Sequence, residues 1–158
     1  MKIETLLKKK GRAVVTIEPG ATIAQAVDLL RSHGIGCVVV SSDGKHIDGL
    51  VAVRDIAYAL AERAAKVRAA RGAEILDLPV DRIMTRDVRT CGPNDTLRHV
   101  MMDMTRLHIL HVPVLRDGAL CGIVSNDDVV KYAVDEMELE KAVMQDSLLM
   151  LKTLDDLR

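Results

Sequence analysis

The sequence predicts an α+β fold with α/β-type layers: two tandem β-α-β-β-α repeats followed by a long C-terminal helix. The first observation behind this prediction is an internal repeat, because the first half of the chain recurs in the second half in the same order. The second is that short β-branched runs alternate with helical patterns in both halves. The third is that residues 125–158 contain neither glycine nor proline, so nothing in them interrupts a helix.

The composition is that of a soluble globular protein. Of its 158 residues, 49% are apolar and 28% are charged. The formal net charge of −1 argues against nucleic-acid binding, which draws most of its affinity from excess positive charge. The longest apolar run, Ile35–Val40, is too short to cross a bilayer, and no signal-peptide pattern opens the chain. The three cysteines form no Cys-x-x-Cys pair, which favours a reducing cytoplasm over a disulfide framework.

The repeat consists of matched segments at a nearly constant offset. The matched pairs, in chain order, are Pro19–Ile23 with Pro93–Leu97, Val38–Val40 with Val112–Val114, Asp43–Gly44 with Asp117–Gly118, and Asp48–Val51 with Cys121–Val124. One residue is lost before the last pair, and Asp55 falls on Asp128 in the same register. So many matches in one order, with a single gap, indicate a duplication.

Local signals in the first half predict where each element begins and ends. The predicted elements are a strand over 14–16, a helix from residue 23, strands over 37–41 and 47–52, and an Ala-rich helix from 57 to about Arg71. Thr22 and Gln25 form a capping-box pattern before the first helix, and Gly34 ends it. Asp43-Gly44 predicts a tight turn between two antiparallel strands, and Gly72 stops the second helix.

The second half repeats this plan, and together the halves set the domain boundaries. Its predicted elements are strands over 88–90, 111–115 and 120–125, a helix over 97–104, and a turn at Asp117-Gly118. We predict residues 1–71 as the first repeat, with an N-terminal helix and an extended helix end. Residues 72–135 form the second repeat, and residues 136–158 form a C-terminal helical extension.

Three motifs make the duplicated chain resemble a known family. They are Asp81–Thr85 ahead of a strand, His111–Val114, and Gly122–Asp128, which reads Gly, two apolar residues, Ser, two free positions and Asp. Together with the repeat, they resemble a tandem pair of cystathionine-beta-synthase (CBS) domains, often called a Bateman module. The resemblance implies a stand-alone, pseudo-twofold pair of domains that binds adenosine-type ligands in clefts between the repeats and usually dimerises.

The resemblance implies a ligand site in the second half. Its residues are Ser125, Asp128, His111, Pro113 and Thr90. A helix N-terminus offers free N–H groups to a phosphate, and an Asp there can accept both ribose hydroxyls. The alternative is that Ser125 and Asp128 form only a capping box at a strand-to-helix junction. We favour ligand binding, because the matching carboxylate in the first half has no hydroxyl with which to form a reciprocal cap.

A second site, in the first half, is predicted to be degenerate. Its residues are Asp55, Thr16 and Cys37. Ala52 stands where the family places a hydroxyl, and Cys37 stands where the second half has the basic His111. Since the chain has no Trp or Phe, a planar ligand in either site would lie between aliphatic side chains and backbone.

No catalytic or metal site is predicted. His108 and His111 point to opposite faces of a strand, and no third ligand is near them in sequence. No residue pattern around Cys91 indicates a general base or an oxyanion hole that would make it a nucleophile, so it is predicted to be a small residue that ends a strand. With no general base, nucleophile or metal set in view, the chain is predicted not to be an enzyme.

The predicted function is that of a non-catalytic, cytoplasmic regulatory module that signals to a partner protein. Its regulatory ligand would be AMP, ADP, ATP or S-adenosylmethionine, with no required cofactor and no nucleic-acid or membrane partner. The alternative is a ligand-independent dimeric scaffold that has lost its sites. A homodimer is predicted because Val130, Met137, Met144 and Leu151 recur every seven residues, and beyond Met137 this seam would otherwise face water.

Overall fold

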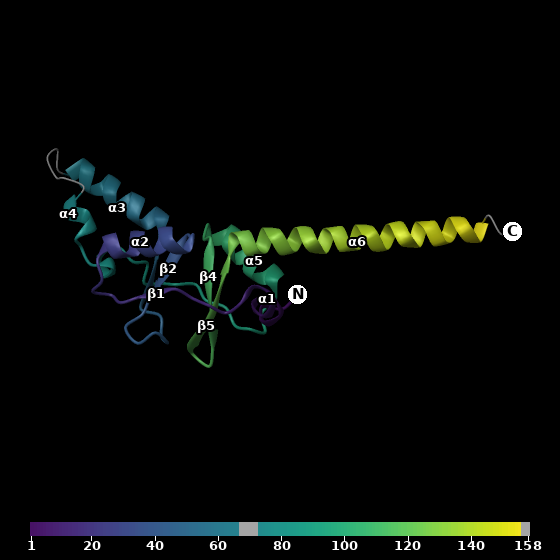
Figure 1. The fold of residues 1–158 in the computed structure, drawn as a ribbon, viewed down its shortest axis with the longest axis horizontal. Coiled ribbons are helices and arrows are strands. Elements are labelled where there is room, and N and C mark those ends of the chain that lie inside the picture. The colour runs from purple at the N-terminus through teal and green to yellow at the C-terminus, as the bar shows by residue number, and fades with distance from the viewer. Residues whose placement is uncertain (67–72, 156–158) are drawn as a thin grey trace. The chain divides into compact units, whose positions relative to one another are not determined.

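The computed structural model describes residues 1–66 and 73–155 of the chain, which falls into two compact units, Met1–Val124 and Ser125–Arg158 (Figure 1). The elements are α1 (Ile3–Lys10), β1 (Thr16–Ile17), α2 (Ile23–His33), β2 (Cys37–Val40), β3 (Gly49–Ala52), α3 (Val53–Lys66), α4 (Ala73–Leu76), a 3-10 turn η1 (Val80–Arg82), α5 (Leu97–Leu107), β4 (His111–Arg116), β5 (Ala119–Ser125) and α6 (Asn126–Asp155). The predicted helix end at Arg71 and Gly72, and the last three residues of the predicted C-terminal helix, lie outside the described residues.

The first repeat contains a three-stranded sheet in the order β1-β2-β3. β1 runs parallel to β2, and β3 runs antiparallel to it with Cys37 opposite Ala52. All four residues of β2 are buried, as the continuous apolar run predicted. Around this strand the core includes Ile23, Val51 and Val80. The first strand lies later than predicted, at Thr16–Ile17, where Thr16 is in register with Val39 and Ile17 with Val40 of β2.

Helix ends follow signals that lie within a few residues of them. The hydroxyl of Thr22 accepts a hydrogen bond from the Gln25 amide (3.2 Å), and the Gln25 side chain accepts one from the Thr22 amide (2.9 Å). This confirms the predicted capping box. Gly34 ends α2 with a φ of 61°, in the left-handed region that favours glycine. α5 ends on a left-handed residue too, but here it is His108, with a φ of 53°.

The second repeat contains the β4-β5 hairpin. Asp117 and Gly118 form its turn with φ values of 51° and 79°, which confirms the predicted two-residue turn. The predicted strand over 88–90 is wrong. Only Cys91 in this region pairs, through an isolated parallel bridge to Val114, so the chain passes β4 without forming a ladder.

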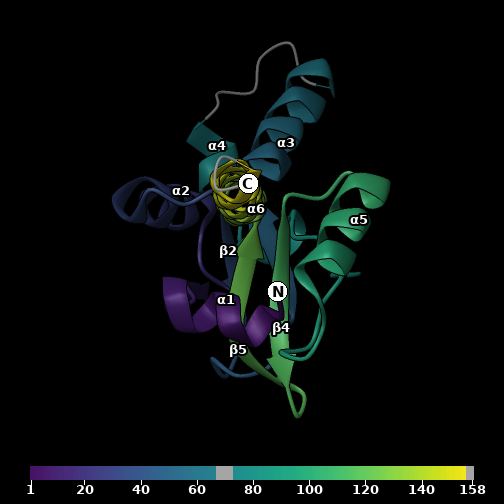
Figure 2. The same cartoon turned by 90° about the vertical axis from the view of Figure 1, so that its right-hand side faces the viewer.

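The N-terminal helix α1 packs against the second repeat, although sequence analysis assigned it to the first. Ile3 and Glu4 donate backbone hydrogen bonds to Asp95 (2.9 Å) and Pro93 (2.8 Å). Leu7 is fully buried and lies so close to Gly122 that a Cβ there would be 2.7 Å from it. Figure 2 shows α1 crossing β5 at this point. The second repeat is therefore completed by residues from the opposite end of the unit.

The second unit is built on α6, a helix of 30 residues. Val129 and Tyr132 in its first turns are buried. From Val134 onward its described apolar side chains are exposed: Val134, Met137, Leu139, Val143, Met144, Leu148, Leu149 and Met150. Across residues 1–66 and 73–155, no helix is both long and apolar enough to span a membrane.

Candidate functional site

A cavity of about 720 Å³ lies in the first unit and draws its lining from both repeats. The first repeat contributes Gly36, Leu50, Ala52, Val53, Arg54 and Asp55. The second contributes Thr85, residues 87–90, Arg106, Leu107 and residues 109–111. This volume falls within the range of small-molecule sites, which are concave and carry a few convergent polar groups. The cavity is therefore the candidate functional site.

Asp55 reaches the cavity from the first turn of α3, where it also caps the helix. Its Oδ2 atom accepts a hydrogen bond from the Ala52 amide (2.8 Å), so the carboxylate satisfies one of the orphan N–H groups of the helix start. Ala52 has no hydroxyl to return the bond, so the cap is one-sided. Sequence analysis excluded only a reciprocal cap at this position, and the one-sided bond agrees with that, so the role of Asp55 as a ligand residue stays a prediction.

Ser125 and Asp128 form the complete version of this cap at the start of α6. Both the amide and the hydroxyl of Ser125 donate to Asp128 Oδ2 (2.8 Å each), and the Asp128 amide donates to the Ser125 hydroxyl (3.3 Å). Ser125 and Asp128 therefore form the capping box that was the alternative to a ligand site. These two residues belong to the second unit, and their assignment as ligand residues stays a prediction.

His111 approaches the first repeat at Gly36. A Cβ on Gly36 would lie 2.9 Å from Cε1 and 3.0 Å from Nε2 of His111, so the glycine leaves the room that the imidazole occupies. Thr90 lines the same cavity. His111 and Thr90 were grouped with Ser125 and Asp128 from the sequence, whereas the cavity brings them together with Asp55. The cavity combines these residues because segments of the two repeats that are distant in sequence lie side by side around it.

The other predicted site residues lie apart from this cavity. Pro113 is buried within β4, where its carbonyl accepts a hydrogen bond from Cys91 (3.1 Å). Thr16 lines a separate cavity of about 880 Å³ beside α2, together with Gln25 and Asp28. Cys37 is buried in β2. Asp55, Thr16 and Cys37 therefore do not line one common cavity.

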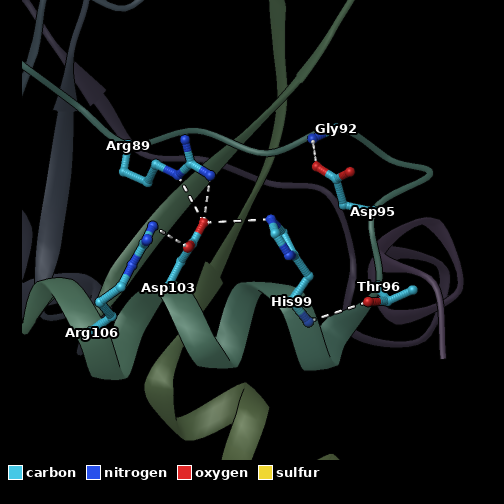
Figure 3. A network of polar contacts seen from close by, with 7 residues as sticks. All are labelled: Arg89, Gly92, Asp95, Thr96, His99, Asp103 and Arg106. Atoms are coloured by element: carbon cyan, nitrogen blue, oxygen red, sulfur yellow. Dashed lines mark hydrogen bonds and ion pairs between the residues drawn. The ribbon is translucent and has the colours of Figure 1, made fainter.

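A buried carboxylate, that of Asp103, binds two of the arginines that line the cavity, Arg89 and Arg106 (Figure 3). Asp103, on α5, is only 6% exposed. Its Oδ2 accepts hydrogen bonds from Nε (2.8 Å) and Nη2 (2.6 Å) of Arg89, and its Oδ1 accepts one from Arg106 Nη2 (3.0 Å). His99 Nε2 lies 3.7 Å from Oδ2. Hydrogen bonding from Arg89 holds the pKa of Asp103 below its ordinary value, so the carboxylate is ionised at neutral pH.

Sequence analysis missed this network. The available signal was an aspartate among Leu97, Val100 and Met104, the apolar positions that face the core along α5. A carboxylate in such a stripe needs partners, because burying an unpaired charge is very costly. The sequence does not say which of the many arginines supplies them.

Two of the cysteines, Cys37 and Cys91, lie in environments that suppress the reactive thiolate form. Burial raises the pKa of Cys37 to about 12, and burial likewise raises the pKa of Cys91 to about 12. The thiolate is the reactive form of cysteine, so the raised pKa lowers the reactivity of both thiols at neutral pH. In the described part of the chain, no group of three or more His, Cys, Asp or Glu side chains is placed to hold a metal ion.

Known proteins share this architecture. The CBS domain family matches residues 11–62 and 80–135. The crystal structure of the CBS-domain containing protein ATU1752 from Agrobacterium tumefaciens is 38% identical, with a TM-score of 0.75, and the match covers 84% of this chain and 99% of that one. The CBS domain-containing protein YhcV of Bacillus subtilis is 28% identical over 129 residues, 82% of this chain and 83% of YhcV. The CBS domain pair of protein MJ0100, solved in complex with 5′-methylthioadenosine and S-adenosyl-L-methionine, shares the fold at 24% identity, with a TM-score of 0.71 and coverage of 86% and 98%.

Proposed function

The chain belongs to the CBS domain family as a tandem pair, and from this premise we propose that it is a non-catalytic regulatory module for an adenosine-type ligand. The observation that carries the proposal is the cavity of about 720 Å³ in which Asp55, His111 and Thr90 come together from two repeats. The MJ0100 pair, which was solved with two adenosyl compounds, supports this choice of ligand class.

The polar and apolar parts of the cavity match the two parts of a nucleoside. Asp55 Oδ2 is engaged with the Ala52 amide, and its other oxygen accepts no hydrogen bond from the described residues, so it is available to a ribose hydroxyl. Val53, Leu107 and Leu110 line the cavity with 56%, 44% and 54% exposure. Exposed apolar side chains at a cavity mark a binding surface, and here they would cover the faces of an adenine base.

Ligand binding would signal by changing how the two repeats pack. The cavity takes residues from both repeats, so a ligand in it stabilises the arrangement to which it binds best. Arg54 already links the repeats at this point, because its Nη1 donates to the carbonyl of His108 (3.1 Å). The altered surface would then be read by a regulated partner protein in the cytoplasm, where free cysteines are stable.

A homodimer is part of the proposal, and α6 is the surface that would form it. Met137, Met144 and Leu148 are each more than half exposed, on a helix whose described apolar side chains face solvent from Val134 onward. Such a surface is costly in water and typically marks an interface. Leu148→Lys should shift a dimer to monomer in light scattering, whereas Gln145→Lys should not. A dimer unchanged by Leu148→Lys would remove α6 from the interface.

The same features support a second candidate, a dimeric scaffold that binds no ligand. In this case Asp55 and Asp128 act only as helix caps. The hydrogen bonds that they accept from the amides of Ala52 and Ser125 are sufficient for that role. The two candidates differ in one measurable property. A ligand that binds only the folded chain raises its melting temperature, whereas a pure scaffold shows no shift with any nucleotide.

Calorimetry on matched aspartate variants tests the proposed site. Asp55→Asn keeps an oxygen that can accept the Ala52 amide but removes the charge, so adenosine-ligand affinity should fall by roughly tenfold or more. Asp95→Asn is the control, because Asp95 accepts the Gly92 amide (2.7 Å) in the same one-sided way but does not line the cavity. Equal binding by both variants and the parent chain would reject Asp55 as a ligand residue.

A further inference from the structure

Beyond the ligand cavity, and resting on the proposed function only for the existence of a regulated partner protein, we infer that one face of α6 docks an amphipathic helix of that partner. The partner helix would carry basic side chains beside its apolar ones. The matched CBS regions end at residue 135, so the ligand cavity does not account for the rest of α6. The docking face, which we call the acidic stripe, consists of three apolar and three acidic residues: Leu139, Val143, Met150, Glu136, Glu140 and Asp146.

The exposed apolar side chains of α6 form two stripes along one continuous helix (Figure 1). Successive residues of an α-helix are rotated by about 100° about its axis. At this spacing the residues of the predicted dimer surface share one side, the dimer stripe: Val134, Met137, Met144 and Leu148. Leu139, Val143 and Met150 lie on nearly the opposite side and are 67%, 58% and 71% exposed. A helix that pairs with a second copy through the dimer stripe therefore leaves the acidic stripe in water.

The two stripes differ in charge. Glu136, Glu140 and Asp146 lie within about 60° of Val143 around the helix axis, on both sides of the apolar residues. All three carboxylates are exposed, and no ion pair among the described residues involves them. Lys141 lies instead on the side of the dimer stripe. The acidic stripe is therefore an apolar surface with a negative rim and no basic residue of its own.

This charge pattern decides which occupant fits the acidic stripe. Residues 135–146 contain five acidic residues and one basic residue, which gives them a formal net charge of −4. Two acidic stripes placed face to face would repel each other, so a second copy of the chain fits poorly there. A helix with an apolar face and Lys or Arg beside it would cover Leu139 and Val143 and place opposite charges next to the carboxylates. The observations therefore favour a basic amphipathic helix.

The test uses the full chain and two labelled synthetic peptides in fluorescence anisotropy. Both peptides are amphipathic helices of about 18 residues, or five turns, with the same leucine face. One has lysine and the other has glutamate at the positions beside that face. The lysine peptide should bind at least about tenfold more tightly, and added salt should weaken its binding severalfold because exposed charges are screened. Equal affinity for both peptides, or binding of neither, overturns the inference.

Neighbouring residues on opposite sides of α6 supply matched variants. Val143→Ser removes an apolar contact and should weaken binding of the lysine peptide about tenfold, whereas Met144→Ser, at a position that is 67% exposed, should change it less than twofold. Glu136→Gln should weaken binding severalfold, whereas Glu138→Gln, on the far side of the helix, should change it less than twofold. All four side chains are exposed, so the variants should fold as the parent does. Equal losses within either pair would mean that the peptide does not bind the acidic stripe.

Two further measurements separate this inference from the proposed function. In light scattering, Val143→Ser should keep the oligomeric state of the parent chain. A shift to a smaller species would place a second copy on the acidic stripe and overturn the inference. Melting-temperature shifts with adenosine, AMP and S-adenosylmethionine, measured without peptide, test the ligand cavity alone. Peptide binding without any such shift keeps the docking surface and overturns the proposed ligand, and a shift without peptide binding does the reverse.

Discussion

The two repeats carry the same Asp-Gly pair at matched positions, but only the second pair makes a two-residue hairpin turn. Asp117 and Gly118 both adopt positive φ and join β4 directly to β5. In the first repeat the loop between Val40 and Gly49 is longer, because Asp43 accepts hydrogen bonds from the amides of Lys45 (2.8 Å) and His46 (2.7 Å). Side-chain-to-backbone bonds of this kind compete with a strand ladder.

A matched pair of glycines shows the same divergence. Gly49 and Gly122 occupy equivalent strand positions, and each lacks a Cβ because another segment crosses it. At Gly49 the crossing segment is Met84–Thr85, including the Thr85 carbonyl oxygen, and at Gly122 it is Leu7 of α1. Duplication thus preserved the strand, while different parts of the chain cover it. A sequence repeat therefore predicts the local backbone geometry of each half, but it does not predict which other segments pack against that half.

The largest expected effect concerns thiol reactivity, which compares the buried Cys37 of the first repeat with the partly buried Cys91 of the second. Burial raises the pKa of both Cys37 and Cys91 to about 12. At pH 8, alkylation of either thiol in the folded chain should be roughly a thousandfold slower than in denaturant, because the thiolate is the reacting species. Mass spectrometry of iodoacetamide time courses measures both sites at once. Fast alkylation of Cys37 alone would mean that the first repeat opens locally.

The glycine pair gives the next largest effect. In Gly49→Ala the new Cβ would lie 2.9 Å from the Thr85 carbonyl oxygen, which is backbone, besides meeting the Met84 side chain. In Gly122→Ala it would meet only side-chain atoms of Leu7 at 2.7 Å. We expect losses of about 3 kcal/mol and about 1 kcal/mol in unfolding free energy, since overpacking costs more where the backbone must move. Denaturant titration of both variants measures the difference, and a larger loss at Gly122 would contradict it.

The comparison also explains which features sequence analysis could predict. The capping box at Thr22 and the turn at Asp117-Gly118 depend on residues within three positions, so their types and spacing determine them. The membership of the cavity was not predictable in this way. His111 lines the same cavity as Asp55 because β4 of the second repeat packs against Gly36 of the first. Nothing in the sequence around His111 or Gly36 indicates that these two residues are in contact. Long-range contacts between repeats are set by packing.

A pH titration compares one ionised aspartate in each repeat. Hydrogen bonds hold the pKa of Asp43, beside His46, and of Asp103, beside Arg89, below the ordinary value of 3.8. A group with a lowered folded pKa stabilises the fold above its unfolded pKa, and this stabilisation is lost as the pH falls through the folded pKa. Unfolding free energy should therefore decrease below about pH 4, and Asp43→Asn or Asp103→Asn should each reduce this decrease. Asp28→Asn is the exposed control, and an equal reduction in it would contradict the assignment.

The smallest effect comes from exchanging the residue that distinguishes the two caps. Ala52→Ser would add to α3 the hydroxyl that Ser125 supplies to α6, where it accepts the Asp128 amide at 3.3 Å. We expect Ala52→Ser to stabilise the chain by about 0.5 kcal/mol and Ser125→Ala to destabilise it by about 1 kcal/mol. Thermal denaturation of both variants measures these changes. Calorimetry then separates capping from ligand binding, because a hydroxyl beside Asp55 in the cavity should also strengthen binding of an adenosine-type ligand. A more stable Ala52→Ser chain with unchanged affinity would mean that the position serves the helix alone.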